Sequence, residues 1–517
     1  MRDWLHICDT THTKCKTPYE PTLPTRVLDI GEVGTTVAKL VETGGAKGRY
    51  ICLSYCWGST PFTKTTQANI ESHKAGIRVS TMCQTFQDVI KVVQQLNIRY
   101  IWIDALCIIQ EDAADWDREA ARMAPYYSNA YLTIAASWAQ SATLGLFPPA
   151  PKTARIGPLE VFSSTRHFPQ LVDDLEHRLP GSDAMAFPML TRGWCFQERL
   201  LSPRVLHFAQ HELIWECRES LTCECGQVGY AYNHTPKPEF FDGISNISTK
   251  LERNSDDSWR RLVAEYTALS LTLVDDRLPA LGGLADEMIR SYSLQGLSRT
   301  YVAGLWVECL LGDLCWKREA GQRCNPRDPA SPDPLPYRAP SWSWASIDGH
   351  VDYSDKLSYG GYRNEPGYRN IEYATVLGAH CTPAGASKTG RVTDGHIDLE
   401  CFLVPAVLKE LDEPDWEGRT LGYEPLQTAY MNLQWYSDGR ARVEPGAEGR
   451  YFVLPLVTID TSSYETFHGI LVQSQSGVLV QEKDERPVMV RIGFVTKRYE
   501  RWSTTMKDLS RRKVRLV

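Results

Sequence analysis

Two side chains of one predicted helix have the types and spacing of a catalytic pair. Trp194 and Glu198 are four residues apart within 191–200, so both would project from the same helix face. A carboxylate beside an aromatic ring suits cleavage of an N-glycosidic bond, because the ribosyl transition state resembles an oxocarbenium cation that a carboxylate stabilises. A purely structural explanation stays open: Glu198 could pair with Arg192 or Arg199, and Trp194 could pack in the core.

Cysteine and histidine side chains form two groups whose types and spacing suit a zinc ion. One group lies near the start of the sequence and the other follows the predicted Glu198 helix; together they comprise Cys8, His12, Cys15, Cys217, Cys223 and Cys225. Neither group follows a Cys-x2-Cys finger pattern, but they offer more than the four ligands that one structural zinc site requires. A shared zinc ion would tie the N-terminal segment to the segment after the helix. Reduced core thiols and a surface histidine are the alternative explanation.

Three short apolar runs predict the buried strands that would position these residues. The runs are Tyr50–Tyr55, Tyr100–Asp104 and Tyr131–Ala136. Helical periodicity predicts amphipathic helices over 83–96 and 113–124, and Pro125 should end or kink the second. Strands separated by helices of this length are typical of βαβ units and therefore of a parallel sheet. Ligands bind such sheets at the carboxyl ends of the strands.

Side chains at that edge of the sheet are the candidate substrate contacts. They are Ser54, Tyr55, Trp57, Gly58, Asp104 and Cys107, joined by Arg192 and Trp194 beside Glu198. Asp104 could hold a ribose hydroxyl or cap the following helix, and Gly58 could admit a phosphate or simply form a turn. No Gly-x-Gly-x-x-Gly run follows the first strand, so Rossmann-type dinucleotide binding is not supported.

Other residues near the same edge leave further alternatives open. Cys107 or Cys195 could act as a nucleophile with His207 or His211 as its base, although a buried cysteine is usually inert. The arginines of this region could favour a phosphate-bearing ligand or form surface salt bridges; they are Arg192, Arg199 and Arg204.

Length and composition bound the class of protein. The chain has 517 residues, more than the roughly 250–300 that one hydrophobic core serves. The pattern predicts four parts: a Cys/His segment with a first strand (1–45), an α/β domain (46–230), a helical segment with a linker (231–335) and a β-rich domain (336–517). The net charge of −7, without a basic block, argues against nucleic acid as a partner. No secretion signal and no apolar run of ~20 residues is found, so we expect no membrane span, a cytoplasmic location and reduced cysteines.

Three long segments resemble the heterokaryon incompatibility (HET) domain proteins of fungi in sequence, order and spacing. They are Tyr50–Gly58, Tyr100–Gln110 and Arg192–Ser202. Flanking features extend the resemblance from the N-terminus to about residue 350. The resemblance implies a role in nonself recognition and regulated cell death.

The same resemblance implies a distant similarity to TIR domains, several of which cleave NAD. TIR domains carry a Phe-Leu-Ser-Phe first strand, an acidic residue after a later strand and a Trp-Cys-x-x-Glu motif. This chain has Cys52–Tyr55, then Asp104, then Trp194–Glu198. By this analogy Glu198 is the catalytic carboxylate, Trp194 is an aromatic neighbour of the nicotinamide, and NAD is the substrate. About fifty residues separate the third predicted strand from the motif, whereas in TIR domains the motif follows that strand closely.

These observations predict a TIR-like, flavodoxin-related α/β domain with a parallel sheet and flanking helices, then a helical segment and a β-rich C-terminal domain. The expected function is that of a HET effector that hydrolyses NAD or a related nucleotide, with self-association or a separate sensor protein controlling it. One alternative is a non-enzymatic adaptor module in which Glu198 is structural. Another is a cysteine-dependent hydrolase or transferase of secondary metabolism on the same scaffold.

Overall fold

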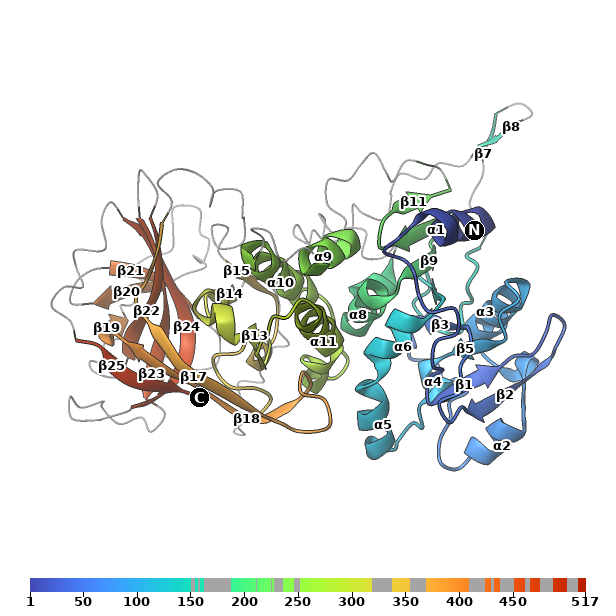
Figure 1. Ribbon diagram of the computed structural model, residues 1–517, viewed down its shortest axis with the longest axis horizontal. Helices are drawn as coiled ribbons and strands as arrows, with labels where there is room; N and C mark the ends of the chain where they lie inside the picture. Colours follow the sequence, from blue (N-terminus) through green and yellow to red (C-terminus); the bar gives the residue numbers. More distant parts are fainter. Residues whose placement is uncertain are drawn as a thin grey trace. The chain divides into compact units, whose positions relative to one another are not determined.

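A computed structural model of the chain forms two compact units (Figure 1). The first unit comprises Met1–Asp242, Leu269–Leu271 and Pro279–Asp286, and the second comprises Gly243–Ala268, Thr272–Leu278 and Glu287–Val517. The structure describes residues 1–149, 154–156, 159–161, 187–210, 212–224, 226, 236–245, 252–318, 337–353, 369–408, 424–428, 432–437, 451–460, 465–474, 487–499 and 510–517. The end of the expected helical segment and linker (231–335), His211, Cys225 and most of the residues between the third strand and Trp194 therefore lie outside the described residues.

A nine-stranded sheet forms the centre of the first unit. Its strands are β1 (Arg26–Asp29), β2 (Val37–Glu42), β3 (Tyr50–Ser54), β4 (Ile77–Arg78), β5 (Tyr100–Trp102), β6 (Leu132–Ala135), β9 (Arg204–Phe208), β10 (Leu213–Cys217) and β11 (Leu221–Cys223). The spatial order is β11-β10-β9-β6-β3-β5-β1-β2-β4. The central strands β9, β6, β3 and β5 are parallel, as expected. The expectation of a parallel sheet is wrong for the outer strands, which pair antiparallel because short connections such as that between β9 and β10 form hairpins.

The helices of the first unit cover both faces of this sheet. They are α1 (Arg2–Thr11), α2 (Ile70–Ala75), α3 (Gln84–Gln95), α4 (Asp104–Cys107), α5 (Ala113–Ala120), α6 (Met123–Asn129) and α8 (Gly193–Leu201). The four parallel strands follow the flavodoxin-like order, with the first strand, β3, between the second, β5, and the third, β6. Right-handed crossovers then put α3 on one face and α6 and α8 on the other, as Figure 1 shows. The chain leaves β3 toward β5 on one side and leaves β6 toward β9 on the other. The connections therefore diverge between the carboxyl ends of β3 and β6.

Burial explains why the predicted elements form. All five residues of β3 are buried, as a strand covered on both faces requires. The helix expected over 83–96 is α3, and it buries the predicted apolar positions Phe86, Val89, Ile90 and Val93. The hydrophobic periodicity of the sequence was therefore sufficient to locate both elements.

The helix expected over 113–124 is instead two helices. α5 ends at Ala120 and α6 begins at Met123, so the break precedes Pro125. Pro125 lies in the first turn of α6, where its missing N–H removes no helical hydrogen bond. Asp104 also differs from its expected position, because it is the first residue of α4 and not the last residue of a strand.

The second unit joins a helical part to a β-rich part. α10 (Glu252–Thr267) buries the predicted stripe of Trp259, Leu262 and Tyr266. Further elements of the helical part are α11 (Pro279–Leu294, whose first half belongs to the first unit), β12 (Tyr301–Val302), β13 (Leu305–Trp306), α12 (Leu310–Asp313), β14 (Trp316–Arg318) and β15 (Val351–Tyr353). α9 (Pro236–Ser245) likewise spans the boundary between the units.

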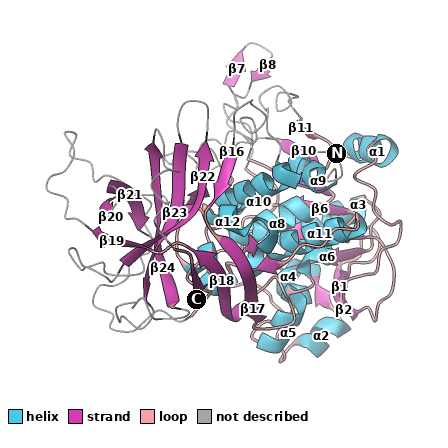
Figure 2. Cartoon of the chain, turned by 60° about the vertical axis from the view of Figure 1, so that its left-hand side comes forward, coloured by secondary structure: helices cyan, strands magenta, loops and turns pink. Residues whose placement is uncertain are grey.

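The C-terminal part is rich in strands, as the sequence predicts, and its described residues form ten of them. They are β16 (Arg369–Glu372), β17 (Thr375–Pro383), β18 (Val392–Cys401), β19 (Val404–Leu408), β20 (Glu424–Thr428), β21 (Asn432–Ser437), β22 (Tyr451–Asp460), β23 (Glu465–Ser474), β24 (Val488–Tyr499) and β25 (Arg512–Leu516). Six of these strands close into a ring, because β23 pairs with both β22 and β24 while β19, β20 and β21 connect those two on the other side (Figure 2). Across the described part of both units, every helix is too short or too polar to cross a lipid bilayer.

Candidate active site

Glu198 of α8 lies at the carboxyl end of β3. Ser54, the last residue of β3, donates a hydrogen bond from its hydroxyl to the Glu198 carboxylate. Tyr127 of α6 lies beside the same carboxylate, and its hydroxyl donates to the Leu53 carbonyl at 3.2 Å. Glu198 is only 7% exposed. The predicted carboxylate therefore occupies the point where sheets with this strand order bind ligands.

Burial is the main reason why the pKa of Glu198 is raised, from 4.5 to about 7. The hydrogen bond from Ser54 opposes this shift, the negative charge of Asp104 adds to it, and the contacts with Tyr127 and Arg192 oppose it. Glu198 therefore exists in both protonation states at neutral pH. A buried carboxyl group with such a pKa is a recognised mark of a functional site.

Asp104 is the second carboxylate of the site. Its side chain accepts hydrogen bonds from the Trp57 indole N–H at 2.8 Å and from the backbone N–H of Ala105 at 2.6 Å. Burial raises the pKa of Asp104, and the bonds from Trp57 and Ala105 oppose the shift. One Asp104 oxygen thus accepts from the first turn of α4, whose N-cap residue is Ile103, while the other oxygen fixes the Trp57 ring.

The Tyr55 hydroxyl is a buried polar group directed at this pair of carboxylates. It lies near enough to Asp104 to stabilise the ionised form of that carboxyl group. Yet it meets the geometry of a hydrogen bond with none of the described residues. Tyr55 is 5% exposed, and its interaction with Asp104 places this hydroxyl among the polar groups of the site.

Arg192 supplies a positive charge next to the two carboxylates. Burial opposes its charged form, but the neighbouring Cys195 and Cys56 thiols and the Glu198 and Asp104 carboxylates outweigh burial and raise the pKa of Arg192. Within the described residues no carboxylate is close enough to form an ion pair with it. Arg192 is half-buried, so its guanidinium is available to an anionic ligand group such as a phosphate.

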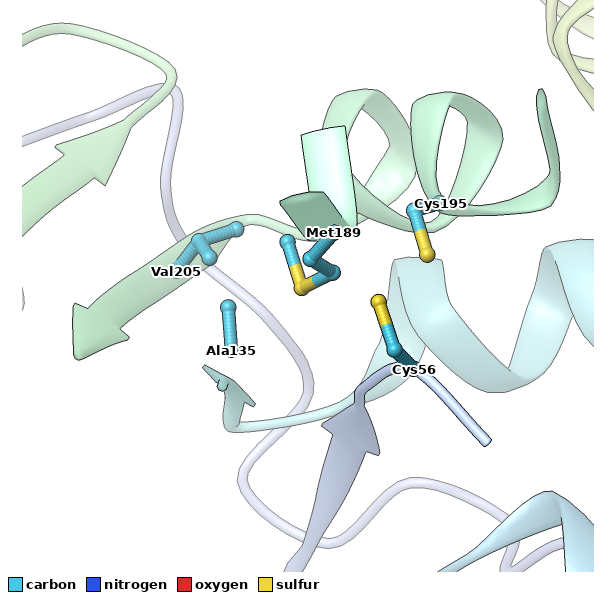
Figure 3. Close-up of a cluster of buried hydrophobic side chains, with 5 residues drawn as sticks. All are labelled: Cys56, Ala135, Met189, Cys195 and Val205. Atoms are coloured by element: carbon cyan, nitrogen blue, oxygen red, sulfur yellow. The ribbon is translucent and has the colours of Figure 1, made fainter. Parts of the chain in front are cut away.

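A small apolar cluster fixes α8 over the end of the sheet. Cys195 of α8 packs with Cys56, Ala135, Met189 and Val205, which come from the ends of β3, β6 and β9 and from the turn before α8. Figure 3 shows the side chains of Cys56 and Cys195 directed toward each other inside this cluster. Because Cys195 and Glu198 are three residues apart on one helix, this packing also sets the position of the carboxylate.

The two candidate aromatic contacts differ in their surroundings. Trp194 is half-buried and meets Trp116 edge to face, with ring centroids 6.2 Å apart. The Trp57 ring carries the Lys64 ammonium 4.3 Å from its centroid. Trp57 is tied to Asp104 and so belongs to the carboxylate pair, whereas Trp194 marks the partly exposed side of α8.

The thiols near the site have the properties of packing residues. Burial raises the pKa of Cys107 to about 12 and that of Cys56 to about 11, and it also raises the pKa of Cys195 well above its usual value. Protonated thiols are poor nucleophiles at neutral pH. The proposed base His207 has both ring nitrogens occupied, by Ser137 at 2.9 Å and by Glu216 at 3.2 Å. The geometry therefore favours the carboxylates over a cysteine as the reactive groups.

Arg199 and Arg204 form structural ion pairs. Arg199 donates two hydrogen bonds, of 2.8 and 2.9 Å, to the Glu216 carboxylate. Arg204 bonds to Asp9 at 2.7 Å. Of the three candidate arginines, only Arg192 is left for a ligand.

Gly58 occupies a turn that no other residue fits well. Its φ is +72°, and an added Cβ would come within 2.5 Å of the Ser141 hydroxyl. We expect Gly58→Ala to lower the free energy of unfolding by about 2–3 kcal/mol, because the φ penalty of about 1 kcal/mol adds to the contact with Ser141. Gly34→Ala is the matched control, since Gly34 also has a positive φ but open space around it. Urea unfolding measures the free energy of unfolding of both variants. An equal decrease in both would show that the contact between the added Cβ and Ser141 has no effect.

Four of the six candidate zinc ligands are brought together. Donor atoms of Cys8, His12, Cys15 and Cys217 all lie within 4.8 Å of one another. Cys223 is absent from this group and packs instead with Phe187, Ala209 and Ile214 in a small apolar cluster.

Tyr127 is the site contact that spacing did not predict. The adjacent Tyr126 has the same type and bonds to Glu119 at 2.9 Å, away from Glu198. Only the rotation of α6 about its axis distinguishes the two, and the break before Pro125 sets that rotation.

Together the fold and the site define a flavodoxin-like α/β domain with a buried, partly ionised carboxylate at the divergence of its crossovers. Residues 50–198 match the family model described as Heterokaryon incompatibility protein (HET). The match begins with the first residue of β3 and ends at Glu198, and it covers less than a third of the chain. Over this segment the chain is similar to the HET domain. No curated protein and no solved structure was found to match the chain.

Proposed function

We propose that this HET-like domain hydrolyses NAD or a related nucleotide at its N-glycosidic bond, as an effector of nonself recognition and regulated cell death. The observation that carries the proposal is Glu198, a buried carboxylate with a pKa of about 7 at the divergence of the crossovers. The similarity to TIR domains implied by Trp194–Glu198 supports the same reaction.

The residues around Glu198 suit the parts of such a substrate. Ionised Glu198 would stabilise the positive charge that develops on the ribose as its bond to nicotinamide breaks. The bonding electrons leave with nicotinamide and neutralise its ring, and water adds to the ribose carbon with loss of a proton. Asp104 or the Tyr55 hydroxyl would hold a ribose hydroxyl, and Arg192 would hold a phosphate. Trp194 would lie against the nicotinamide ring.

The direct test is to incubate concentrated full-length protein with NAD and to follow nicotinamide release. A high protein concentration is used because self-association is expected to control the activity. Release of nicotinamide by the wild type, with loss in Asp104→Asn and Arg192→Met variants that remain folded, supports the proposal. An extract of the cells that naturally make the protein is added to supply any missing activator. If folded, concentrated protein still releases no nicotinamide, the result contradicts the proposed NAD hydrolysis.

The pH dependence gives a second test. Glu198 must be ionised to stabilise a cation, so kcat/KM should rise with pH and level off above a pKa of about 7. A rate that falls as pH increases from 6 to 8 would mean that the protonated carboxyl is the active form, contrary to this mechanism.

The enclosure of Glu198 favours a second candidate, a non-enzymatic adaptor. A carboxyl group that is 7% exposed and bonded to Ser54 could simply join α8 to β3. Expression of Glu198→Gln in the host distinguishes the two: an adaptor would still cause cell death, and a hydrolase would not.

A further inference from the structure

Three thiols and an imidazole converge at one place in the first unit, outside the group of residues around Glu198. Cys8 and His12 come from α1 and its end, Cys15 follows, and Cys217 is the last residue of β10. The His12 Nδ1 atom lies 3.3 Å from the Cys217 sulfur and 3.9 Å from the Cys15 sulfur. The four donor atoms all lie within 4.8 Å of one another.

The distances from His12 to Cys217 and Cys15 are close to those of a tetrahedral metal site, and the other donor atoms lie within about 1 Å of such spacing. Zinc–sulfur bonds of about 2.3 Å at tetrahedral angles set neighbouring donor atoms about 3.5–3.8 Å apart. Three cysteines and one histidine are also one of the ligand sets of closed structural zinc sites. The three cysteines are buried and His12 is half-buried, so a metal ion here would be shielded from solvent.

The groups around the sulfur atoms fit thiolate ligands. Cys217 is approached by the backbone N–H of Ser220 at 3.3 Å and by the Ser220 hydroxyl at 3.2 Å. The Arg204 guanidinium lies 3.2 Å from the Cys8 sulfur. Donors of this kind stabilise the negative charge that metal-bound sulfur carries and orient the ligand.

We propose that Cys8, His12, Cys15 and Cys217 bind one structural zinc ion. The ion joins the N-terminal segment to the end of β10, two parts of the chain about two hundred residues apart. Cys223 is not a ligand, because it packs in the apolar cluster with Ile214.

The proposed zinc ion also supports the candidate active site. Cys217 adjoins Glu216, whose carboxylate accepts two hydrogen bonds from Arg199. Arg199 follows Glu198 on α8. The zinc ion thus holds the strand that anchors the Glu198 helix, so its loss should loosen α8 as well as the N-terminus.

The test is the metal content of full-length protein purified under reducing conditions, measured by mass spectrometry of the elements. We expect one zinc per chain in the wild type and in Cys83→Ser, a matched control at a half-buried cysteine outside the group. Cys15→Ser and Cys217→Ser should lose the zinc, with a fall in melting temperature of at least about 5 °C.

A second variant keeps the test decisive if those proteins do not fold. His12→Asn changes a half-buried position, and it should keep the fold but release zinc to a chelator faster than the wild type. Cobalt(II) added to zinc-depleted protein should give the visible bands of tetrahedral thiolate coordination, altered in His12→Asn. Wild type without zinc and without these bands, or a disulfide between any two of the three cysteines, would overturn the proposal.

Discussion

Glu198→Gln should abolish nicotinamide release and, above pH 7, make the protein more stable. The amide cannot carry the negative charge that stabilises the ribosyl cation, so kcat/KM should fall at least about a thousandfold. Burial raises the pKa of Glu198 from 4.5 to about 7, so ionising it in the folded state costs up to about 3 kcal/mol. Glutamine avoids that cost and retains a partner for the Ser54 hydroxyl.

The stability gain should depend on pH in a definite direction. Between pH 4.5 and about 7 the folded protein binds more protons at Glu198 than the unfolded chain does, so wild-type stability falls as pH rises through this range. The free energy of unfolding of Glu198→Gln does not fall in this way, because glutamine does not ionise. The difference in free energy of unfolding should therefore be small at pH 4.5 and largest at pH 8.

Urea unfolding at both pH values measures this difference, and Glu71→Gln is the control because Glu71 lies on the exposed side of α2. A Glu198→Gln variant that is equally destabilised at both pH values, in a protein that releases no nicotinamide, would point to a structural carboxylate. That result would favour the adaptor function.

Asp115→Ala should lower the free energy of unfolding by about 3–5 kcal/mol, because it leaves the buried Arg26 guanidinium without its counterion. Asp115 forms an ion pair with Arg26 and also accepts hydrogen bonds from the Ile109 N–H and from Arg118, both at 2.8 Å. Arg26 is 5% exposed and Asp115 is 1% exposed. The Arg26 guanidinium also donates to the Cys107 carbonyl at 2.6 Å, at the end of the helix that Asp104 begins. Asp104 should consequently be displaced as well.

Asp117→Ala is the matched control for this change. Asp117 lies on the same helix, α5, but is exposed, so its loss should alter stability by less than about 0.5 kcal/mol. Thermal or urea unfolding of the two variants compares them directly. Similar stabilities for both would show that the Arg26–Asp115 pair adds nothing to the fold.

Patterns that act over a few residues were predicted well from sequence. The apolar run of Tyr50–Tyr55 and the helical spacing of 83–96 predicted β3 and α3, because a continuous apolar run and a helical period are both local patterns. The antiparallel outer strands were not predicted. Strand direction depends on pairing partners such as β1 and β5, which are distant in sequence and leave no local mark.

The candidate site shows the same division. Ser54 and Asp104 could be chosen because they lie where predicted strands end, and Glu198 because of its helical spacing from Trp194. The Arg199–Glu216 pair could not be chosen, since a turn and a hairpin must form before those residues meet. Among the candidate zinc ligands, sequence supplied the residue types, but only the register of β10 with β11 separates Cys217 from Cys223.

The nine-stranded sheet ends on each side in a very short strand, two residues long in β4 and three in β11. An edge strand can bind a strand of another chain through its unpaired backbone N–H and C=O groups. A strand of two or three residues offers only one or two such hydrogen bonds. Association of further chains with the edge strands β4 and β11 is therefore weak. If the proposed function is controlled by self-association, that assembly would therefore have to use side-chain surfaces and not the edges of this sheet.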